Sequence, residues 1–219
     1  MHDIYAFVSG PLAWVAFIVF IGGSIYRLGH LIALTHRKEK FIYSYLSWKY
    51  SLRSILHWVT PFATENMRRH PFLTIVTFAF HICLLACPVF LLAHVVLIEE
   101  AWSLSWWTLP DSAAIFMTAI VIASCLFFLV RRKTRAEVRY VTAFSDYVIL
   151  AIVAAPFVTG LVAYYQWFGL ELFSILHILA GELMLVAIPF TRLSHMLFAP
   201  LTRAYMGSEF GGVRGARDW

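Results

Sequence analysis

The sequence carries little charge for its length. Charged side chains make up only 13% of its 219 residues, whereas 61% are hydrophobic and the mean hydropathy is +0.77. A soluble domain typically has about 25% charged residues. So few charges cannot cover an aqueous surface, which excludes an ordinary soluble enzyme, a disordered tail and a nucleic-acid binder, although the net charge is +5. We therefore expect an integral membrane protein.

Cysteine is also scarce, and its spacing excludes two kinds of redox site. The three cysteines are Cys83, Cys87 and Cys125. They form neither the Cys-x-x-Cys-His motif of covalently bound haem nor the Cys-x-x-Cys run of an iron–sulfur cluster. The chain also lacks an internal repeat and an inverted pair of broken helices, which argues against a secondary transporter. Any iron–sulfur centre that works with this chain must belong to another subunit.

Long apolar stretches dominate what is present. Five of them are near the roughly 20 residues that a membrane-spanning helix needs. They do not show the alternation of apolar and polar residues that is typical of a membrane β-barrel. We predict an all-α fold, an integral membrane five-helix bundle that forms a single membrane domain over residues 1–219, with spans at 11–26, 72–98, 112–130, 147–167 and 172–190.

The positive charges predict the orientation of these spans. All 17 lysines and arginines lie between residues 27 and 69, between residues 131 and 139, or from residue 192 onward. These three stretches share one side of the predicted membrane, and the other side carries only acids. By the positive-inside rule, the N-terminus lies outside and the C-terminus in the cytoplasm. We expect a multi-pass protein of a bacterial or archaeal cytoplasmic membrane.

Aromatic residues mark both predicted interfaces. The segment 41–62, within the cytoplasmic link 27–71, mixes aromatic and aliphatic residues with Lys49 and Arg53. It fits an amphipathic helix in the inner interface or a docking surface for a cytoplasmic iron–sulfur partner, and the two can coexist. Tryptophans near the outer interface fit an aromatic belt that anchors the protein at its depth. They are Trp14, Trp102, Trp106, Trp107 and Trp167.

Four of the nine histidines belong to two of the apolar segments. His81 and His94 lie in the second, and His177 and His195 lie in or just after the fifth. Because these segments run in opposite directions, His81 and His195 lie toward the cytoplasm, and His94 and His177 toward the outside. Ionisable groups at membrane depth are costly and usually functional. Imidazole is a common axial ligand of haem iron, so two facing pairs predict two haems that pass electrons.

The spacing within each segment permits this pairing. His177 and His195 are 18 residues apart, so on one continuous helix they share a face about 27 Å apart. His81 and His94 are 13 residues apart, which puts them about 140° out of phase on an ideal helix. Pro88 lies between them, and a kink there could change the phase. The alternative is that these histidines pack between helices in a non-redox assembly or transport protein; a zinc site lacks a third ligand.

Several segments resemble a known family. Residues 176–181 (LHILAG) and 188–195 (IPFTRLSH) look like the last helix of the respiratory nitrate reductase gamma subunit, a five-helix dihaem cytochrome b. Phe80 and His81 resemble that family's first ligand position, and residues 23–27 (GSIYR) resemble the exit of its first helix. Asp146 has a similar counterpart. The run 48–71 also looks like the cytoplasmic link of related cytochrome b subunits in sulfate-reducer redox complexes, such as the high-molecular-weight cytochrome c complex.

The resemblance implies two haem b groups. The inner one would lie between His81 and His195 and the outer one between His94 and His177, with menaquinol oxidised near the outer haem. The sequence departs from nitrate reductase in that His94 lies three residues further along than the corresponding ligand. A lysine near that family's quinol site is also missing, since residues 110–112 read PDS.

Three charged residues are candidates for supporting roles. Arg192 stands one turn before His195 and could pair with a haem propionate, as could Arg27, while a plain positive-inside anchor is the alternative for both. Glu182 lies five positions after His177, about 140° from the ligand face of an ideal helix. It could accept a proton from a quinol, or it could be neutral and bonded to a neighbouring helix.

Together these features predict a dihaem b-type subunit of a membrane respiratory redox complex. It would carry electrons across the membrane between menaquinone or a periplasmic multihaem cytochrome c and a cytoplasmic iron–sulfur protein, with other membrane subunits as neighbours. A haem subunit that lacks a quinone site and serves only as a wire is a further alternative.

Overall fold

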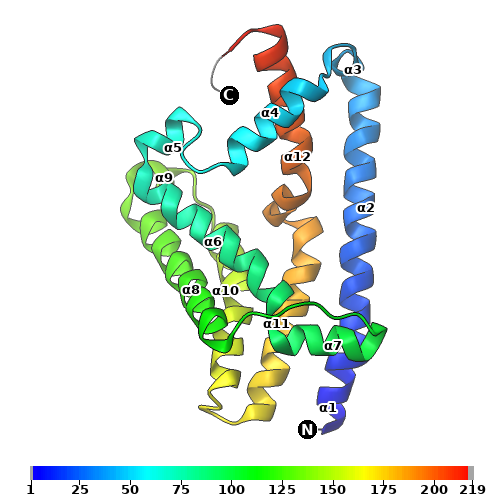
Figure 1. Cartoon of the computed structure of the whole chain (residues 1–219), viewed down its shortest axis with the longest axis vertical. Coiled ribbons are helices and arrows are strands. Elements are labelled where there is room, and N and C mark those ends of the chain that lie inside the picture. Colours follow the sequence, from blue (N-terminus) through cyan, green and yellow to red (C-terminus); the bar gives the residue numbers. More distant parts are fainter. Residues whose placement is uncertain (1, 217–219) are drawn as a thin grey trace. The chain divides into compact units, whose positions relative to one another are not determined.

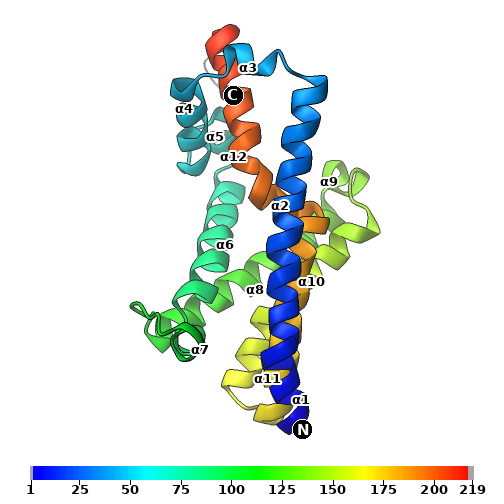
Figure 2. The same ribbon diagram turned by 90° about the vertical axis from the view of Figure 1, so that its right-hand side faces the viewer.

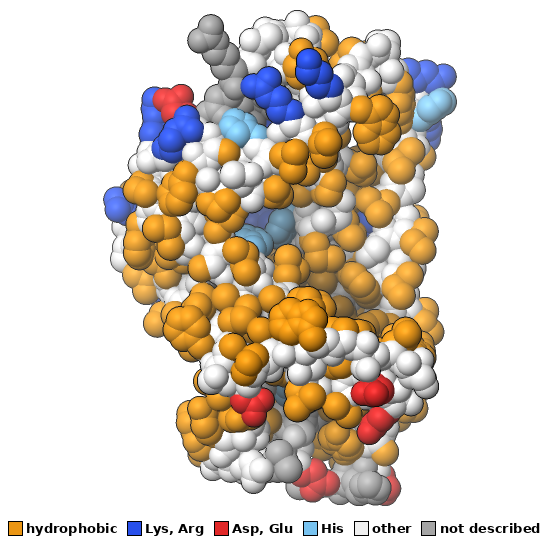
Figure 3. Space-filling view, viewed as in Figure 1, with side chains coloured by type: hydrophobic (Ala, Val, Ile, Leu, Met, Phe, Trp, Pro, Cys, Tyr) orange, Lys and Arg blue, Asp and Glu red, His pale blue; other side chains and the backbone are white. Residues whose placement is uncertain are grey.

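The computed structural model describes residues 2–216, and within them the chain forms helices joined by turns (Figure 1). Five helical stretches are long and apolar enough to cross a membrane, namely Asp3–Lys38, Pro71–Phe90, Asp111–Thr134, Phe144–Tyr164 and Glu171–Phe190. Hydrophobic side chains cover most of the face seen in Figure 3. The predicted all-α, multi-pass membrane fold is therefore confirmed.

The first span is longer than predicted. It begins with α1 (His2–Phe7), continues through a π-helical turn, η1 (Val8–Leu12), and ends with α2 (Ala13–Lys38). Figure 2 shows α2 as one continuous helix. Its last turn holds the basic residues His36, Arg37 and Lys38, and the charges of Arg37 and Lys38 are favourable at the negative end of the helix dipole. The helix thus extends well beyond the apolar core that predicted it.

The described chain divides into two compact units. The first unit comprises residues 2–10 and 76–181, and the second comprises residues 11–75 and 182–216. Helix α11 (Leu170–Phe190) contributes its first part to the first unit and its second part to the second. The single membrane domain proposed for residues 1–219 stays a prediction.

The second predicted span is two helices rather than one. Helix α6 (Pro71–Phe90) ends where Leu91 takes an extended conformation, with φ −72° and ψ 130°, and α7 (Leu92–Trp102) follows. Figure 1 shows the chain changing direction between them. Pro88, three residues before the break, has no backbone N–H to donate, which weakens the helix locally. The kink that the sequence suggested at Pro88 is therefore a full break at Leu91.

The rest of the first unit is built on packed helices. Helix α8 (Asp111–Thr134) packs against α10 (Phe144–Tyr164), with the short α9 (Ala136–Tyr140) between them in the chain. Asp146 is buried and accepts a hydrogen bond from the backbone N–H of Ala143 at 2.8 Å, so it caps the start of α10. Its carboxylate also lies 4.0 Å from Arg132. Asp146 therefore has a structural role in this unit.

Three short helices form the link between the first two spans. They are α3 (Ile42–Tyr45), α4 (Trp48–Val59) and α5 (Glu65–Arg69). The segment 41–62, predicted as one interfacial helix, is thus divided at Leu46, which is extended. Thr64 caps α5 by accepting a hydrogen bond from the backbone N–H of Met67 at 3.2 Å.

The C-terminal part of the second unit packs on α4. After α11, the chain forms a short 3-10 turn, η2 (Arg192–Ser194), then α12 (His195–Met206) and η3 (Gly207–Val213). Helix α4 contacts both α12 and η3. The contact is close because small residues meet: a Cβ added at Gly207 would lie 2.4 Å from the Tyr50 carbonyl oxygen. Ser51 and Ser208 hydroxyls lie 3.2 Å apart and are buried.

Candidate functional site

The break after α6 is closed by hydrogen bonds from outside that helix. The last four carbonyls of a helix have no partner within it, and in lipid each must find one. The Cys87 carbonyl accepts from the backbone N–H of Leu91 at 3.0 Å. The Pro88 carbonyl accepts from Nδ1 of His94 at 2.9 Å. The break thus exposes an acceptor, and His94 is the side chain that satisfies it.

The loop after α7 donates hydrogen bonds to the last two carbonyls of α6. Trp106 donates its indole N–H to the Val89 carbonyl at 2.8 Å, and Leu109 donates its backbone N–H to the Phe90 carbonyl at 2.8 Å. The Phe90 and Trp107 rings stack with centroids 4.6 Å apart. The end of α6, which orients His94, is therefore held in place by the segment 103–110.

His177 is oriented by the neighbouring helix α10. Its Nδ1 lies 2.8 Å from the Pro156 carbonyl, which it reaches across 21 residues of sequence. One turn after Pro156 stands Gly160, where an added Cβ would lie 2.9 Å from both Nδ1 and Cε1 of His177. Only a glycine at this position lets the imidazole lie directly on the α10 backbone. Helices α10 and α11 follow each other in the chain, and the turn that joins them contains Gly169 at φ 96°.

The structure brings His94 and His177 together. Their ring centroids are 6.0 Å apart and their planes differ by 13°. In each ring Nδ1 faces a backbone carbonyl, so Nε2 is the nitrogen that remains to bind a metal. Metal-binding histidines typically make such a bond through their other nitrogen, because it sets the tautomer and the ring orientation.

The separation of the two rings fits a metal held between them. A metal bound by one nitrogen of each of two imidazoles, at about 2 Å per bond, separates the ring centres by about 6 Å. Both side chains are half-buried. No group of three or more His, Cys, Asp or Glu side chains gathers within residues 2–216. Two imidazoles are the residues that the structure brings together here, and two imidazoles are also the axial ligands of a bis-histidine haem.

Nδ1 of His81 and Nδ1 of His195 each lie near a carbonyl of their own local backbone. Nδ1 of His81 lies 2.8 Å from the Thr77 carbonyl, one turn earlier on α6. Nδ1 of His195 lies 2.9 Å from the Arg192 carbonyl, three residues earlier. As in His94 and His177, Nδ1 of each ring therefore faces a backbone carbonyl. The two residues belong to different units, and their pairing stays a prediction.

His177 and His195 do not lie on one continuous helix, so the predicted common face about 27 Å apart is wrong. Helix α11 ends at Phe190, and Thr191 is extended at φ −123° and ψ −171°. The Thr191 hydroxyl accepts a hydrogen bond from the backbone N–H of Leu193 at 3.2 Å and so caps the turn that follows. His195 opens a new helix, α12, and its direction is set by this turn rather than by helical phase.

Arg27 lies beside the helix that carries His195. Its guanidinium is 5.5 Å from the centroid of the Phe198 ring, which stands one turn after His195 on α12. Nε of Arg27 and Oγ of Ser24, one turn earlier on α2, are both buried without a hydrogen-bond partner among the described residues. Two orphaned donors on one helix face fit a carboxylate such as a haem propionate. Arg192, the other predicted partner, is exposed on η2.

Glu182 lies on α11 and is only 8% exposed. Its Oε1 is buried and accepts no hydrogen bond from any described residue. A buried carboxyl oxygen with no partner is costly, which is the usual mark of a functional group at membrane depth. The structure therefore leaves Glu182 available for the proton role that the sequence suggested.

Sequence reasoning missed the residues that orient His94 and His177. Gly160 and Pro156 are spaced four apart on span four, so they share a helix face, and this pattern could have indicated a close contact. Trp106 was assigned only to the aromatic belt. Its indole N–H is a donor that can pair with a carbonyl left free at a helix break, but the sequence does not tell which carbonyl it reaches.

The chain resembles a bacterial protein along its whole length. It is 35% identical over 216 residues to a protein of Nitratidesulfovibrio vulgaris (strain Hildenborough), and the match covers 97% of this chain and 96% of that one. The chain belongs to the family of that protein. The family likeness extends over both units. No family profile matches the chain, and no solved structure matches it.

Proposed function

We propose that this chain is a dihaem b-type cytochrome subunit that carries electrons across the membrane. The observation that carries the proposal is the His94–His177 pair, with near-parallel rings 6.0 Å apart and Nδ1 of each on a backbone carbonyl. His94 and His177 would hold one haem, and His81 and His195 would hold the other. When bound, a haem iron between two imidazoles takes up and gives away single electrons.

The chain's own residues would hold and insulate these groups. Because Nδ1 of each imidazole faces a carbonyl, Nε2 is the nitrogen that would bind the iron. Arg27 and Arg192 would pair with propionates on the side that the charges predict to be cytoplasmic. The apolar surface of the spans excludes water and confines the electron path to the protein.

The direct test is a pyridine haemochrome spectrum with iron quantification on the purified chain. We expect about two b-type haems per chain. A chain without haem would contradict the proposal and leave the histidines as packing residues of a non-redox membrane protein.

Glu182 would accept the proton that a quinol releases when it is oxidised. The unpartnered, buried Oε1 supports this role. Haem reduction by a menaquinol analogue, with partner subunits removed, tests whether this chain has a quinol site at all. If it does, Glu182→Gln should keep the haem spectrum and slow the reduction. Normal reduction in that variant would remove the proton role, and no reduction in the native chain would leave it as a wire.

One end of the electron path must lie in other subunits, since this sequence has no cluster motif. We propose a periplasmic multihaem cytochrome c and a cytoplasmic iron–sulfur protein as neighbours. Co-purification from native membranes, followed by spectroscopy for c-type haem and iron–sulfur signals, would identify them.

A further inference from the structure

We propose that helix α2 positions His195 through Gly23, which makes this glycine a positioning residue for one of the two haems. The inference rests on the proposed function, because it concerns the haem that His195 would bind. The contacts that carry it lie within the second unit. They join α2 to the chain on both sides of the turn η2, which leads into His195.

The first contact joins Gly23 to the end of α11. A Cβ added at Gly23 would lie 2.8 Å from Cζ of Phe190 and 2.9 Å from Cγ of Pro189. The Phe190 side chain is 58% exposed, so its ring can turn aside. Pro189 is fully buried, and its ring is closed onto its own backbone nitrogen. An added methyl group therefore fits only if the backbone at the end of α11 moves.

This end of α11 is where the chain turns toward His195. Pro189 has no backbone N–H to donate within the helix, and Thr191, two residues later, is extended. The single turn η2 then leads into His195. Because so short a segment joins them, a movement of the α11 end is passed on to the backbone that carries the imidazole.

The second contact joins the same face of α2 to the helix that follows the turn. Arg27 stands about one helical turn after Gly23, so the two residues share a face of α2. The Arg27 guanidinium is 5.5 Å from the centroid of the Phe198 ring, which follows His195 on α12. Helix α2 thus contacts the chain both before and after His195.

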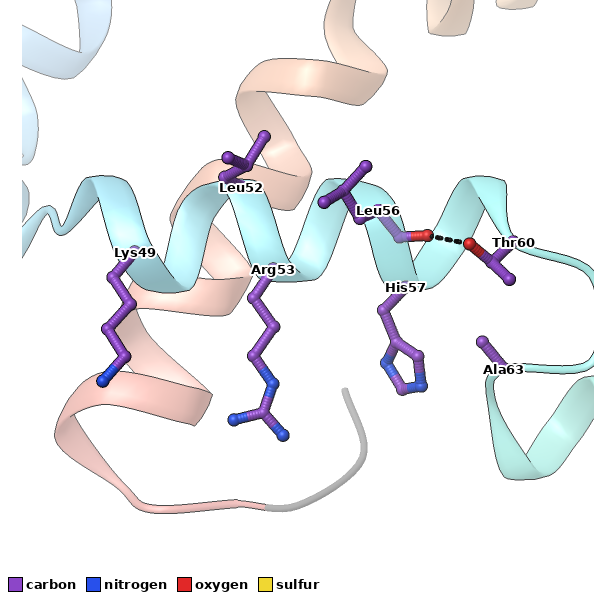
Figure 4. Close-up of a pocket in the computed structure, with 7 residues that line it drawn as sticks. All are labelled: Lys49, Leu52, Arg53, Leu56, His57, Thr60 and Ala63. Carbon is purple, nitrogen blue, oxygen red and sulfur yellow. Dashed lines mark hydrogen bonds between the residues drawn. The ribbon is translucent and has the colours of Figure 1, made fainter.

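The far end of α12 is held by α4. Figure 4 shows α4 lying across α12 and η3, and both of them contact it. Ser51 of α4 donates a hydrogen bond to the Ala204 carbonyl of α12 at 3.2 Å. Because α4 holds that end, a displaced α11 end would change the position of His195 instead of moving the whole of α12.

The test compares Gly23→Ala with Gly22→Ala in the purified full chain. Both variants add one methyl group to α2, but nothing lies within 4 Å of an added Cβ at Gly22. We expect Gly23→Ala to shift the midpoint potential and the low-spin resonance of the haem that is lost in His195→Ala, and to leave the other haem unchanged. Gly22→Ala should behave as the native chain. An unshifted haem in Gly23→Ala, or the same shift in both variants, would overturn the inference.

A native chain without haem would contradict the proposed function, and hydrogen exchange tells this failure from the other because it needs no haem. In Gly23→Ala, the backbone amides of residues 191–198 should exchange about tenfold faster than in Gly22→Ala, a ratio within the usual effect of overpacking. Equal exchange in the two variants would show that Gly23 does not hold the turn.

A second variant covers the case in which Gly23→Ala does not fold. Phe198→Leu removes the ring beside the Arg27 guanidinium and adds no atom to a close contact. It should shift the haem that is lost in His195→Ala. Its control, Leu201→Ala, changes an exposed side chain of α12 and should shift neither haem. A shift of the other haem alone in Phe198→Leu, or no shift, would overturn the role of α2.

Discussion

The two sets of histidines differ in how their rings are held. Nδ1 of His94 and His177 reaches carbonyls of Pro88 and Pro156, six and 21 residues away, across a helix break and a helix contact. Nδ1 of His81 and His195 reaches carbonyls only four and three residues back. The Nδ1 contacts of the first pair therefore cross between segments of the chain, whereas the Nδ1 contacts of the second set lie within about one turn. Changes in the segments that supply the distant carbonyls should disturb the first pair more than the second set.

Removing the histidines should have the largest effect. Because one imidazole cannot hold a haem as two do, H94A and H177A should each lose the same spectral component, about half of the haem. H81A and H195A should lose the other. Difference spectra and haem quantification check this. The control H70A, in the link, should keep both haems. Loss of different components in H94A and H177A would contradict their pairing.

The next largest effect is expected from Gly160→Ala. Its added Cβ would lie 2.9 Å from two atoms of the His177 ring, so the imidazole must leave the α10 backbone. Overpacking of this kind costs about 1–3 kcal/mol. We expect a shifted potential or altered low-spin signal for the haem of His94 and His177 only, measured by redox titration and electron paramagnetic resonance.

The matched control for this variant is Gly181→Ala, on α11, where nothing lies within 4 Å of an added Cβ. It should behave as the native chain. In Gly160→Ala, a change at the haem assigned to His81 and His195, without a change at the haem assigned to His94 and His177, would contradict the distinction between the two sets.

Trp106→Phe should have a smaller effect at the same site. It removes the indole donor of the Val89 carbonyl, and a carbonyl left without a partner away from water costs about 1–3 kcal/mol. The end of α6 should loosen, so backbone hydrogen exchange of residues 87–95 should rise. Trp107→Phe keeps an aromatic ring beside Phe90 and should change exchange less. Equal exchange in the two variants would show that the loop does not hold the break.

The smallest effect is a pH response confined to the second unit. A hydrogen bond from Tyr205, with Arg214 close by, holds the pKa of Glu209 below its usual value. The stabilisation is therefore present above the unfolded pKa and is lost as pH falls through the folded pKa. Protection factors of residues 195–216 should fall between pH 7 and about pH 3. Glu209→Gln should remove this response, and its persistence in that variant would assign it to another group.

Much of the fold could be predicted because runs of hydrophobic residues can be recognised along the sequence, without knowing which residues meet in space. Five apolar runs of sufficient length give five helices, since a chain in lipid must satisfy its own backbone. Pro88 predicts a distortion of this span, and the helix breaks three residues later, at Leu91. The break itself, at Leu91, could not be predicted, because it depends on donors from Trp106 and Leu109 that arrive from later in the chain.

By itself the sequence determined the class of the protein and the residues with the capacity for chemistry. Low charge and long apolar runs require a membrane protein, and they make His81, His94, His177 and His195 stand out. Only the tertiary structure decided that His94 and His177 meet, because a helix break and the absence of a Cβ at Gly160 set both ring positions. The phase of one ideal helix does not apply to His81 and His94, because they lie on two helices, α6 and α7, separated by the break at Leu91. The break is possible because later segments supply donors to the carbonyls that it frees, as every carbonyl in lipid requires.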